Sequence, residues 1–226
     1  MKRTHVLLDL DGTLSDSEPG ILRSLQWACE QEGFPIPTEA EVRSVIGPPF
    51  EIGLPSIGIP DDALERVINR YRERYEETGA YENTMYDGVI EMLDQLAELG
   101  LSLSIATAKP EQTAHPILDY FGISERFDVR AGASLTSERR TKAQVIDHAL
   151  RELAIHADPD LADHVIMVGD RDHDVHGAMH HGIACVGVTW GYGSVTELLK
   201  AGAVALADSP DDVAALVTEP YRLRHS

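Results

Sequence analysis

Near its N-terminus the sequence reads VLLDLDGT over residues 6–13, an apolar run that ends in two aspartates and a Gly-Thr pair. A short, continuously apolar run is typical of a strand buried on both faces of a parallel sheet, and the DGT that follows is typical of a turn at its end. Similar apolar runs recur along the chain at residues 101–106, 165–168, 184–188 and 204–206, with a weaker one at 127–131.

Helical patterns separate these runs. Apolar residues recur mostly at helical spacing in four segments, at 87–99, 141–153, 174–181 and 194–200. Strands that alternate with helices of this length imply a parallel sheet covered on both faces. We therefore predict an α/β fold with a Rossmann-like, doubly wound parallel sheet.

The alternation is interrupted directly after the first run. Residues 16–84 show no convincing strand pattern and several helical ones, the clearest at 61–78, where apolar side chains line one face opposite many charges. We predict a core domain made of residues 1–15 and 85–226, with an all-helical domain, residues 16–84, inserted into it.

Charge and composition narrow the classes of function. The 226 residues include 19 Lys and Arg against 38 Asp and Glu, for a formal net charge of −19. This acidity argues against nucleic acid or an anionic membrane as a partner, because phosphates are bound by clustered Lys and Arg. Cys29 and Cys185 are too far apart and unpatterned for a disulfide framework or a zinc site. No apolar run has the length of a signal peptide or a membrane span, so we expect a reduced, cytoplasmic protein.

Charged or hydroxyl side chains lie directly after the C-terminal ends of several predicted strands. In open parallel sheets ligands bind beyond the carboxyl ends of the strands, so we expect these side chains to share one edge of the sheet. They are Asp9 and Asp11 after the first run, Thr107 and Lys109 after the second, Lys142 at the start of a helix, and Asp170, Asp172 and Asp174 after the run at 165–168.

This set of residue types points to phosphoryl transfer. Clustered carboxylates raise one another's pKa unless a hard cation lies among them, and Mg²⁺ prefers oxygen ligands. A carboxylate can attack phosphorus to form an aspartyl-phosphate, while a lysine and a hydroxyl hold the oxygens of the transferred group. A second carboxyl group can protonate the leaving alcohol and later deprotonate a water.

Four motifs in this order resemble those of the haloacid dehalogenase superfamily: DLDGT at 9–13, Thr107, Lys142 and GDRDHD at 169–174. The helical insertion after the first motif is similar to the cap domain of the phosphoglycolate-phosphatase-like branch. Within that branch a 5′-nucleotidase-like subgroup looks closest, on the segments IGPPF at 46–50, ATAKP at 106–110, GASL at 132–135 and GDRDHD at 169–174.

The resemblance implies a role for each matching residue. Asp9 matches the nucleophile, which is also a metal ligand. Asp11 matches the general acid and base, and its backbone carbonyl would bind the metal. Thr107 matches the phosphate-binding hydroxyl, and Lys142 the lysine that stabilises the nucleophile and the phosphoryl oxygens.

The resemblance also implies a metal site and a phosphate cradle. Asp170 matches an acidic metal ligand, and Asp174 a second one that acts through water. Backbone amides near Leu10, Asp11 and Ala108 would complete the cradle. Lys109 has no role in the minimal motif, and its position suggests a further contact with phosphate or substrate.

The function we predict is a Mg²⁺-dependent phosphatase that hydrolyses a small phosphorylated metabolite, as a monomer or a dimer. A phosphomutase of the β-phosphoglucomutase-like kind would share the first half of the reaction and remains an alternative. A phospho-aspartate signalling module is a second alternative, although receiver modules are about half this length and place the aspartate after their third strand.

Three further groups of residues receive less specific interpretations. Four histidines close in the chain are interpreted as surface residues. Residues 190–193, which read WGYG, are interpreted as a packing loop after the fifth strand, with proximity to the substrate as the alternative. Four side chains of the insertion are candidates for substrate specificity, although each is better explained as an ordinary surface or packed residue. The histidines are His173, His176, His180 and His181, and the candidates are Arg43, Phe50, Arg72 and Arg74.

Overall fold

The computed structural model describes residues 3–47, 50–134 and 138–221. The chain divides into two compact units, one made of Met1–Ser15 with Met85–Ser226 and the other of Asp16–Thr84. Pro48, Pro49 and Leu135, which belong to segments quoted above, lie outside the described residues.

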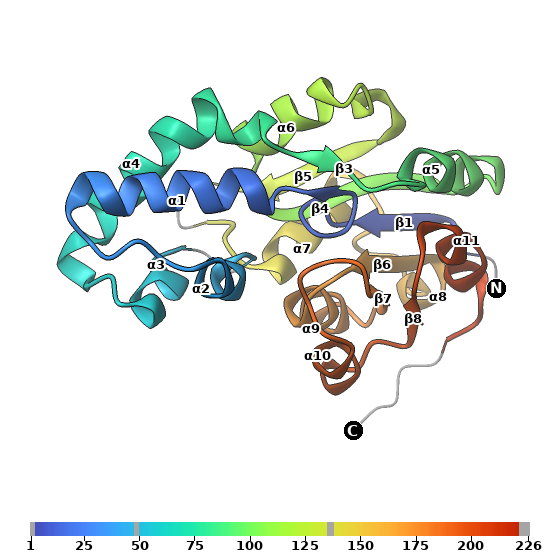
Figure 1. The fold of residues 1–226 in the computed structure, drawn as a ribbon. Helices are drawn as coiled ribbons and strands as arrows, with labels where there is room; N and C mark the ends of the chain where they lie inside the picture. The colour runs from blue at the N-terminus through green and yellow to red at the C-terminus, as the bar shows by residue number, and fades with distance from the viewer. Residues whose placement is uncertain (1–2, 48–49, 135–137, 222–226) are drawn as a thin grey trace. The chain divides into compact units, whose positions relative to one another are not determined.

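The larger unit is built on a six-stranded sheet in which every pairing is parallel (Figure 1). The strand order is β5-β4-β1-β6-β7-β8, so chain order runs outward from β1 in both directions. The predicted α/β fold with a doubly wound parallel sheet is thus confirmed. The strands are β1 (His5–Leu8), β4 (Ser102–Pro110), β5 (Val129–Ala133), β6 (Val165–Gly169), β7 (Ala184–Val188) and β8 (Ala205–Ala207).

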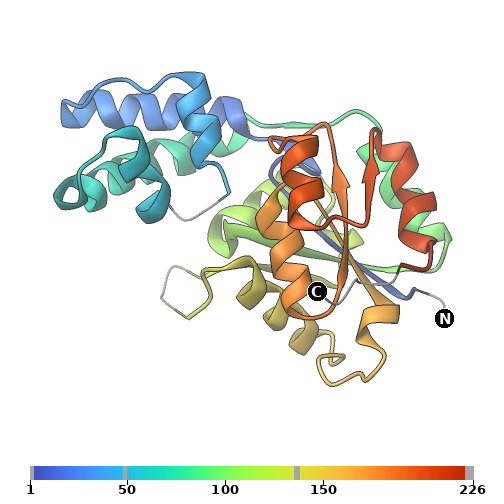
Figure 2. The same cartoon turned by 90° about the horizontal axis from the view of Figure 1, so that it is seen from below.

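The handedness of the crossovers places the helices on the two faces of this sheet. Connections that step toward β5 and those that step toward β8 must lie on opposite faces, because parallel crossovers are right-handed. Helices α7, α9 and α10 pack on one face, the side seen in Figure 2, above a core that includes Leu7, Met167 and Cys185. The helices of this unit are α5 (Val89–Glu98), α6 (Glu111–Tyr120), α7 (Lys142–Glu152), α8 (Leu161–His164), α9 (Asp172–His180), α10 (Val195–Ala201) and α11 (Pro210–Thr218).

Strand ends differ from the sequence prediction at two places that matter for the site. The first strand stops at Leu8, so Asp9 and Leu10 already belong to the turn that follows. The second runs on to Pro110, and its register against β5 shifts between Ala106 and Pro110. A bulge next to a ligand site redirects the side chains that it carries, here those of residues 107–109.

The smaller unit is helical, as predicted. Helix α1 packs along α4 through apolar residues such as Leu25 and Val67, both fully buried. Two-residue strands, β2 (Ser15–Asp16) and β3 (Thr84–Met85), pair where the chain passes between the units. The helical segments are α1 (Glu18–Glu32), α2 (Glu39–Val45), α3 (Phe50–Gly53), η1 (Leu54–Ile57), η2 (Asp61–Ala63), α4 (Leu64–Glu77) and η3 (Gly79–Tyr81).

None of the helices within the described ranges has both the length and the apolar character needed to cross a membrane.

Because β1 lies in the middle of the sheet, we expect its apolar side chains to be essential for stability. Leu7 is fully buried, and Leu7→Ala should lower the free energy of unfolding by about 2–5 kcal/mol, through lost burial and the cavity left behind. Leu199→Ala, at a side chain that is 56% exposed, is the control and should change it by less than about 0.5 kcal/mol. Urea unfolding followed by circular dichroism measures both, and equal losses would contradict this account of the core.

Candidate active site

The turn after β1 folds back on the end of β6. Asp9 N donates to Val168 O at 3.0 Å, and the amides of Leu14 and Ser15 both donate to Leu10 O, which closes the turn. Gly12 has a φ of +80°, and a Cβ at this position would overlap the Asp170 carboxylate. Glycine is therefore required here both for its backbone conformation and for space. Asp9 and Asp170, far apart in the chain, are brought to the same edge of the sheet.

Lys142 connects two of the predicted acids. Its Nζ lies 2.9 Å from Asp9 Oδ1 and 2.7 Å from Asp174 Oδ1, and it donates to Ala106 O at 2.9 Å. Burial alone would lower the pKa of Lys142, but the attraction of Asp174 and Asp9 outweighs it and raises that pKa. Lys142 is thus a buried, permanently charged group at the centre of the site.

The start of α7 explains how Lys142 reaches this point. Thr141 and Gln144 form a capping box in which each side chain accepts from the other residue's backbone N–H, so the helix begins at Lys142. Arg139 and Arg140 are the neighbouring cations in the chain. Arg139 instead pairs with Glu111 at 2.7 Å, and Arg140 N is bound by the Gln144 side chain.

Lys142 contacts two buried carboxylates, Asp9 and Asp174, and a third buried carboxylate, Asp170, interacts with both of them; the pKa values of the three respond differently. Burial raises the pKa of Asp9 more than Lys142 lowers it. Burial, then Asp174 and Asp9, raise the pKa of Asp170 to about 7. Burial acts on Asp174 in the same sense, but Lys142 and His173 together bring its pKa below the ordinary value. One ammonium cannot neutralise three carboxylates, and the raised pKa values of Asp9 and Asp170 reflect burial first and the neighbouring negative charges second.

The donor set fits a divalent cation. Asp9, His173 and Asp174 each offer a ligand atom within 4.8 Å of the others. Apart from Lys142 Nζ, no described donor reaches Oδ1 of Asp9 or of Asp174. Because the ammonium already lies against both oxygens, a cation has a more favourable position beside Asp170, away from Lys142.

Asp174 is held in place from a second side. Its Oδ2 accepts from Arg171 N at 3.0 Å, at the start of α9, and its side chain is fully buried. The structure therefore places Asp174 as a partner of Lys142, and its role as a metal ligand through water stays a prediction.

Lys109 has a partner that the sequence did not suggest. Its Nζ lies 2.8 and 3.0 Å from the two carboxylate oxygens of Asp11, and both side chains are largely buried. Lys109 N also donates to Thr107 Oγ1 at 3.2 Å, and Ala108 between them is half-buried. The bulged end of β4 thus brings Thr107, Ala108 and Lys109 to the edge where Asp9 and Asp11 lie.

Sequence reasoning underestimated two features of the site. His173, interpreted as a surface residue, lies with Nε2 4.0 Å from Asp174 Oδ1 and Nδ1 3.7 Å from Asp172 Oδ1. Residues 190–193, interpreted as packing, contact the site: Tyr192 N donates to Asp170 Oδ2 at 2.7 Å. The position of His173 inside the GDRDHD motif was an available signal for the first, and the position of residues 190–193 after the predicted strand at 184–188 was a signal for the second. His176 and His180 are exposed, as expected.

Two of the candidates for substrate specificity form ion pairs within the smaller unit. Arg43 pairs with Glu18 at 2.6 Å, and Arg74 pairs with Glu82 at 2.9 Å. Phe50 packs edge-on against Tyr71 with ring centroids 4.6 Å apart. These three side chains support the fold of the unit, which leaves Arg72 as the candidate whose role stays open.

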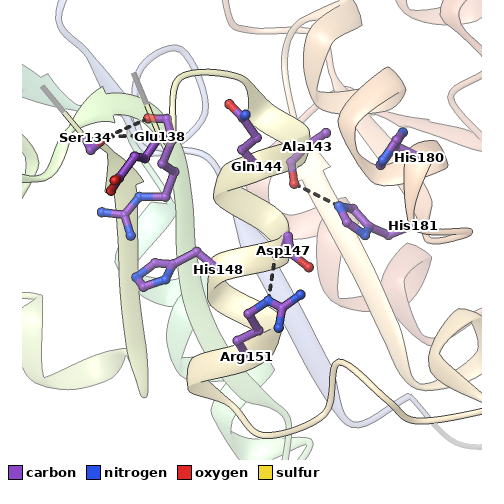
Figure 3. Close-up of a pocket in the computed structure, with 10 residues that line it drawn as sticks. Ser134, Glu138, Ala143, Gln144, Asp147, His148, Arg151, His180 and His181 are labelled. Carbon is purple, nitrogen blue, oxygen red and sulfur yellow. Dashed lines mark hydrogen bonds and ion pairs between the residues drawn. The ribbon is translucent and has the colours of Figure 1, made fainter. Parts of the chain in front are cut away.

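A polar cavity of about 640 Å³ lies along the exposed face of α7 (Figure 3). Its charged groups are paired locally, as Arg151 with Asp147 at 2.8 Å, and His181 Nε2 lies 2.8 Å from Ala143 O. Lys142 is on the buried face of the same helix, so this cavity is separate from the acidic site.

The family model for haloacid dehalogenase-like hydrolases matches residues 6–188, which include every residue of the acidic site. The chain belongs to this family. The predicted resemblance is therefore confirmed.

Relatives within the family carry different names. A 5′-nucleotidase from Pseudomonas aeruginosa is 37% identical over 88% of this chain and 88% of its own length. A tyrosine-protein kinase PtkA from Mycobacterium tuberculosis is 42% identical over 83% of this chain, which spans only 62% of that protein. Among solved structures, a predicted phosphatase from Clostridium acetobutylicum has a TM-score of 0.88 and 32% identity, with 96% of this chain and 99% of that chain covered.

The raised pKa of Asp170 makes a prediction about the metal-free protein. Between pH 3.8 and about 7 the folded chain keeps a proton on Asp170 that the unfolded chain has released, so the free energy of unfolding falls as pH rises through this window. Asp170→Asn removes that dependence and should stabilise the metal-free protein near pH 8 by on the order of 2 kcal/mol.

Urea unfolding in EDTA at several pH values measures this effect. The exposed control Asp61→Asn should keep the wild-type pH profile. A variant Asp170→Asn that is less stable than the wild type at pH 8 would show that the carboxylate is not under electrostatic stress.

Proposed function

We propose that this chain is a metal-dependent phosphatase that hydrolyses a small phosphomonoester through an aspartyl-phosphate on Asp9. The observation that carries the proposal is the buried contact of Lys142 with Asp9 and Asp174, beside Asp170, where strand order reverses around β1. Relatives named 5′-nucleotidase and phosphoglycolate phosphatase support the same class of reaction.

In the first half-reaction a carboxylate oxygen of Asp9 attacks phosphorus, and the bond from phosphorus to the leaving oxygen breaks. Asp11 donates a proton to that oxygen, so the alcohol leaves neutral. The positive charge of Lys142 reduces the electrostatic repulsion between the carboxylate nucleophile and the phosphoryl oxygens. Thr107 and the amide of Ala108 would hold the phosphoryl group.

In the second half-reaction Asp11 takes a proton from a water, which attacks the phosphorus of the aspartyl-phosphate. The bond from Asp9 to phosphorus breaks, phosphate leaves, and Asp9 is again a carboxylate. Lys109 orients Asp11 through its two short contacts, and protonation of Asp11 weakens that pair, which leaves Lys109 available to the phosphoryl oxygens.

The cation that fits best is Mg²⁺, held by Asp9, Asp170 and the backbone carbonyl of Asp11. When bound, it would neutralise part of the negative charge on the transferred group. The presence of three buried carboxylates beside the one ammonium of Lys142 supports the proposal of a bound cation.

A second candidate is phosphoryl transfer to a protein tyrosine, favoured by the 42% identity to the proteins named tyrosine-protein kinase PtkA. A kinase and a phosphatase of this design would share the attack by Asp9 and differ in the acceptor. Incubation with ATP and a tyrosine peptide, beside a panel of phosphomonoesters, separates the two. A phosphomutase would be revealed by a phosphorylated sugar among the products.

Loss of the nucleophile should abolish turnover. Asp9→Asn is expected to lower kcat on a phosphomonoester at least about a thousandfold, because the amide cannot form the intermediate. The exposed control Asp87→Asn should retain wild-type kcat. Circular dichroism checks that both variants are folded, and activity surviving in Asp9→Asn would exclude Asp9 as the nucleophile.

The intermediate should accumulate when the second step is blocked. In Asp11→Asn the water has no base, whereas p-nitrophenolate leaves without needing a proton. Mass spectrometry after mixing with p-nitrophenyl phosphate should then show one added phosphoryl group on the peptide that contains Asp9. Full turnover by this variant would remove Asp11 from the mechanism.

The metal requirement can be tested with two ions. Mg²⁺ should restore activity after EDTA treatment, and Ca²⁺ should not, because its larger and looser coordination shell disturbs in-line attack. Equal activity with the two ions would contradict the proposed geometry.

A further inference from the structure

Residues 190–193, between β7 and α10, make close contacts with the metal-binding side of the site. Trp190 Nε1 donates to Thr13 O at 3.1 Å, and Tyr192 N donates to Asp170 Oδ2 at 2.7 Å. Thr13 Oγ1 in turn donates to the other oxygen, Asp170 Oδ1, at 3.3 Å. The loop, the turn after β1 and the start of the loop after β6 therefore form a closed set of hydrogen bonds around one carboxylate.

The two glycines of this loop leave no space for a side chain. A Cβ at Gly191 would overlap Gly12 O and the Asp170 side chain, and a Cβ at Gly193 would overlap Asp170 O. Neither glycine has a positive φ, so backbone conformation does not require glycine at these two positions. Close packing against Asp170 and Gly12 is the physical reason for both.

Asp170 needs such support because it is fully buried among like charges. Its side chain is fully buried, and the Thr13 hydroxyl and the Tyr192 amide each donate a hydrogen bond to one of its two oxygens. A hydrogen bond from a backbone amide fixes which oxygen points toward the cation. The loop can therefore set the direction of the ligand.

We propose that the loop Trp190–Gly193 is a positioning element that orients the Asp170 carboxylate against the turn at Gly12 and Thr13 and so sets the affinity of the site for a divalent cation. This inference rests on the proposed metal-dependent function. Tyr192 acts through its backbone and Trp190 through its indole N–H, so neither is a catalytic residue.

The test measures metal binding directly on the full chain. Mn²⁺, which carboxylates bind well, is titrated into EDTA-treated and desalted protein, and free Mn²⁺ is read from its EPR signal. Gly191→Ala should weaken binding roughly 10- to 100-fold, the usual effect of losing an outer-shell contact. Trp190→Phe keeps an aromatic ring at this position but loses the indole N–H together with part of the ring volume, so the expected loss of affinity is about threefold to tenfold. Thr196→Ala, exposed on α10, is the control and should bind as the wild type does.

Thermal unfolding separates positioning from general stability. Trp190→Phe should keep a metal-free Tm near that of the wild type, while the rise in Tm caused by Mn²⁺ becomes smaller. Should Gly191→Ala fail to fold, Trp190→Phe alone decides the question. Wild-type Mn²⁺ affinity in Trp190→Phe, or in a folded Gly191→Ala, would overturn the proposal.

The outcomes also distinguish this proposal from the proposed function. If the wild type hydrolyses phosphomonoesters with added metal and both variants bind Mn²⁺ normally, the positioning role fails and the function stands. If the variants lose affinity but the wild type hydrolyses no phosphomonoester, the positioning role stands and the function fails. A wild type that binds no Mn²⁺ overturns both.

Discussion

The buried ammonium of Lys142 between Asp9 and Asp174 is the interaction on which the site depends. Two ionised carboxylates buried close together repel each other strongly unless a positive charge lies beside them. Lys142 supplies that charge for Asp9 and Asp174, and Asp170 is left with a raised pKa. The site thus has two parts. In one part Lys142 contacts Asp9 and Asp174, and in the other, around Asp170, we propose that the cation binds.

The topology of the sheet makes this arrangement possible. Because β1 lies between β4 and β6, the residues that follow these three strands meet at one edge, although about 160 positions separate Asp9 from Asp170 in the chain. Helix α7, which follows β5, packs against β4 and β5, and its first residue, Lys142, reaches the same edge. Residues 190–193 then close the site from the next strand outward, β7.

Much of this could be predicted from the sequence, because each predicted residue ends an apolar run or begins a helix. Parallel topology alone is enough to bring Asp9, Asp170 and Lys142 together. The pairing of Lys109 with Asp11 was not predictable in this way. It depends on a bulge in β4, and a bulge does not produce a recognisable pattern of apolar and polar residues. The ends of two strands were predicted wrongly for a related reason. After Leu8 the apolar sequence continues into the turn, so the strand was predicted too long. Before Pro110 the apolar sequence stops ahead of the bulge, so that strand was predicted too short.

The contacts of the loop at 190–193 show a different limit of sequence reasoning. Hydrophobic periodicity indicates which face of an element is buried, but a glycine-rich loop has no period, and its partners at Gly12 and Asp170 are set by the tertiary fold. The glycines are informative only once the space around them is known.

The two candidate functions, hydrolysis and transfer to a tyrosine, would use the same residues of the acidic site. In the mechanism that we propose, Asp9, Lys142 and Asp170 all lie in the larger unit, and their roles would serve hydrolysis and transfer equally. What distinguishes a phosphatase from a kinase is the identity of the second acceptor, water or a hydroxyl, and therefore the groups that admit or exclude water. In the proposed mechanism both reactions would use Asp11 as the acid and base, so we expect the choice between them to depend on residues beyond the acidic site itself.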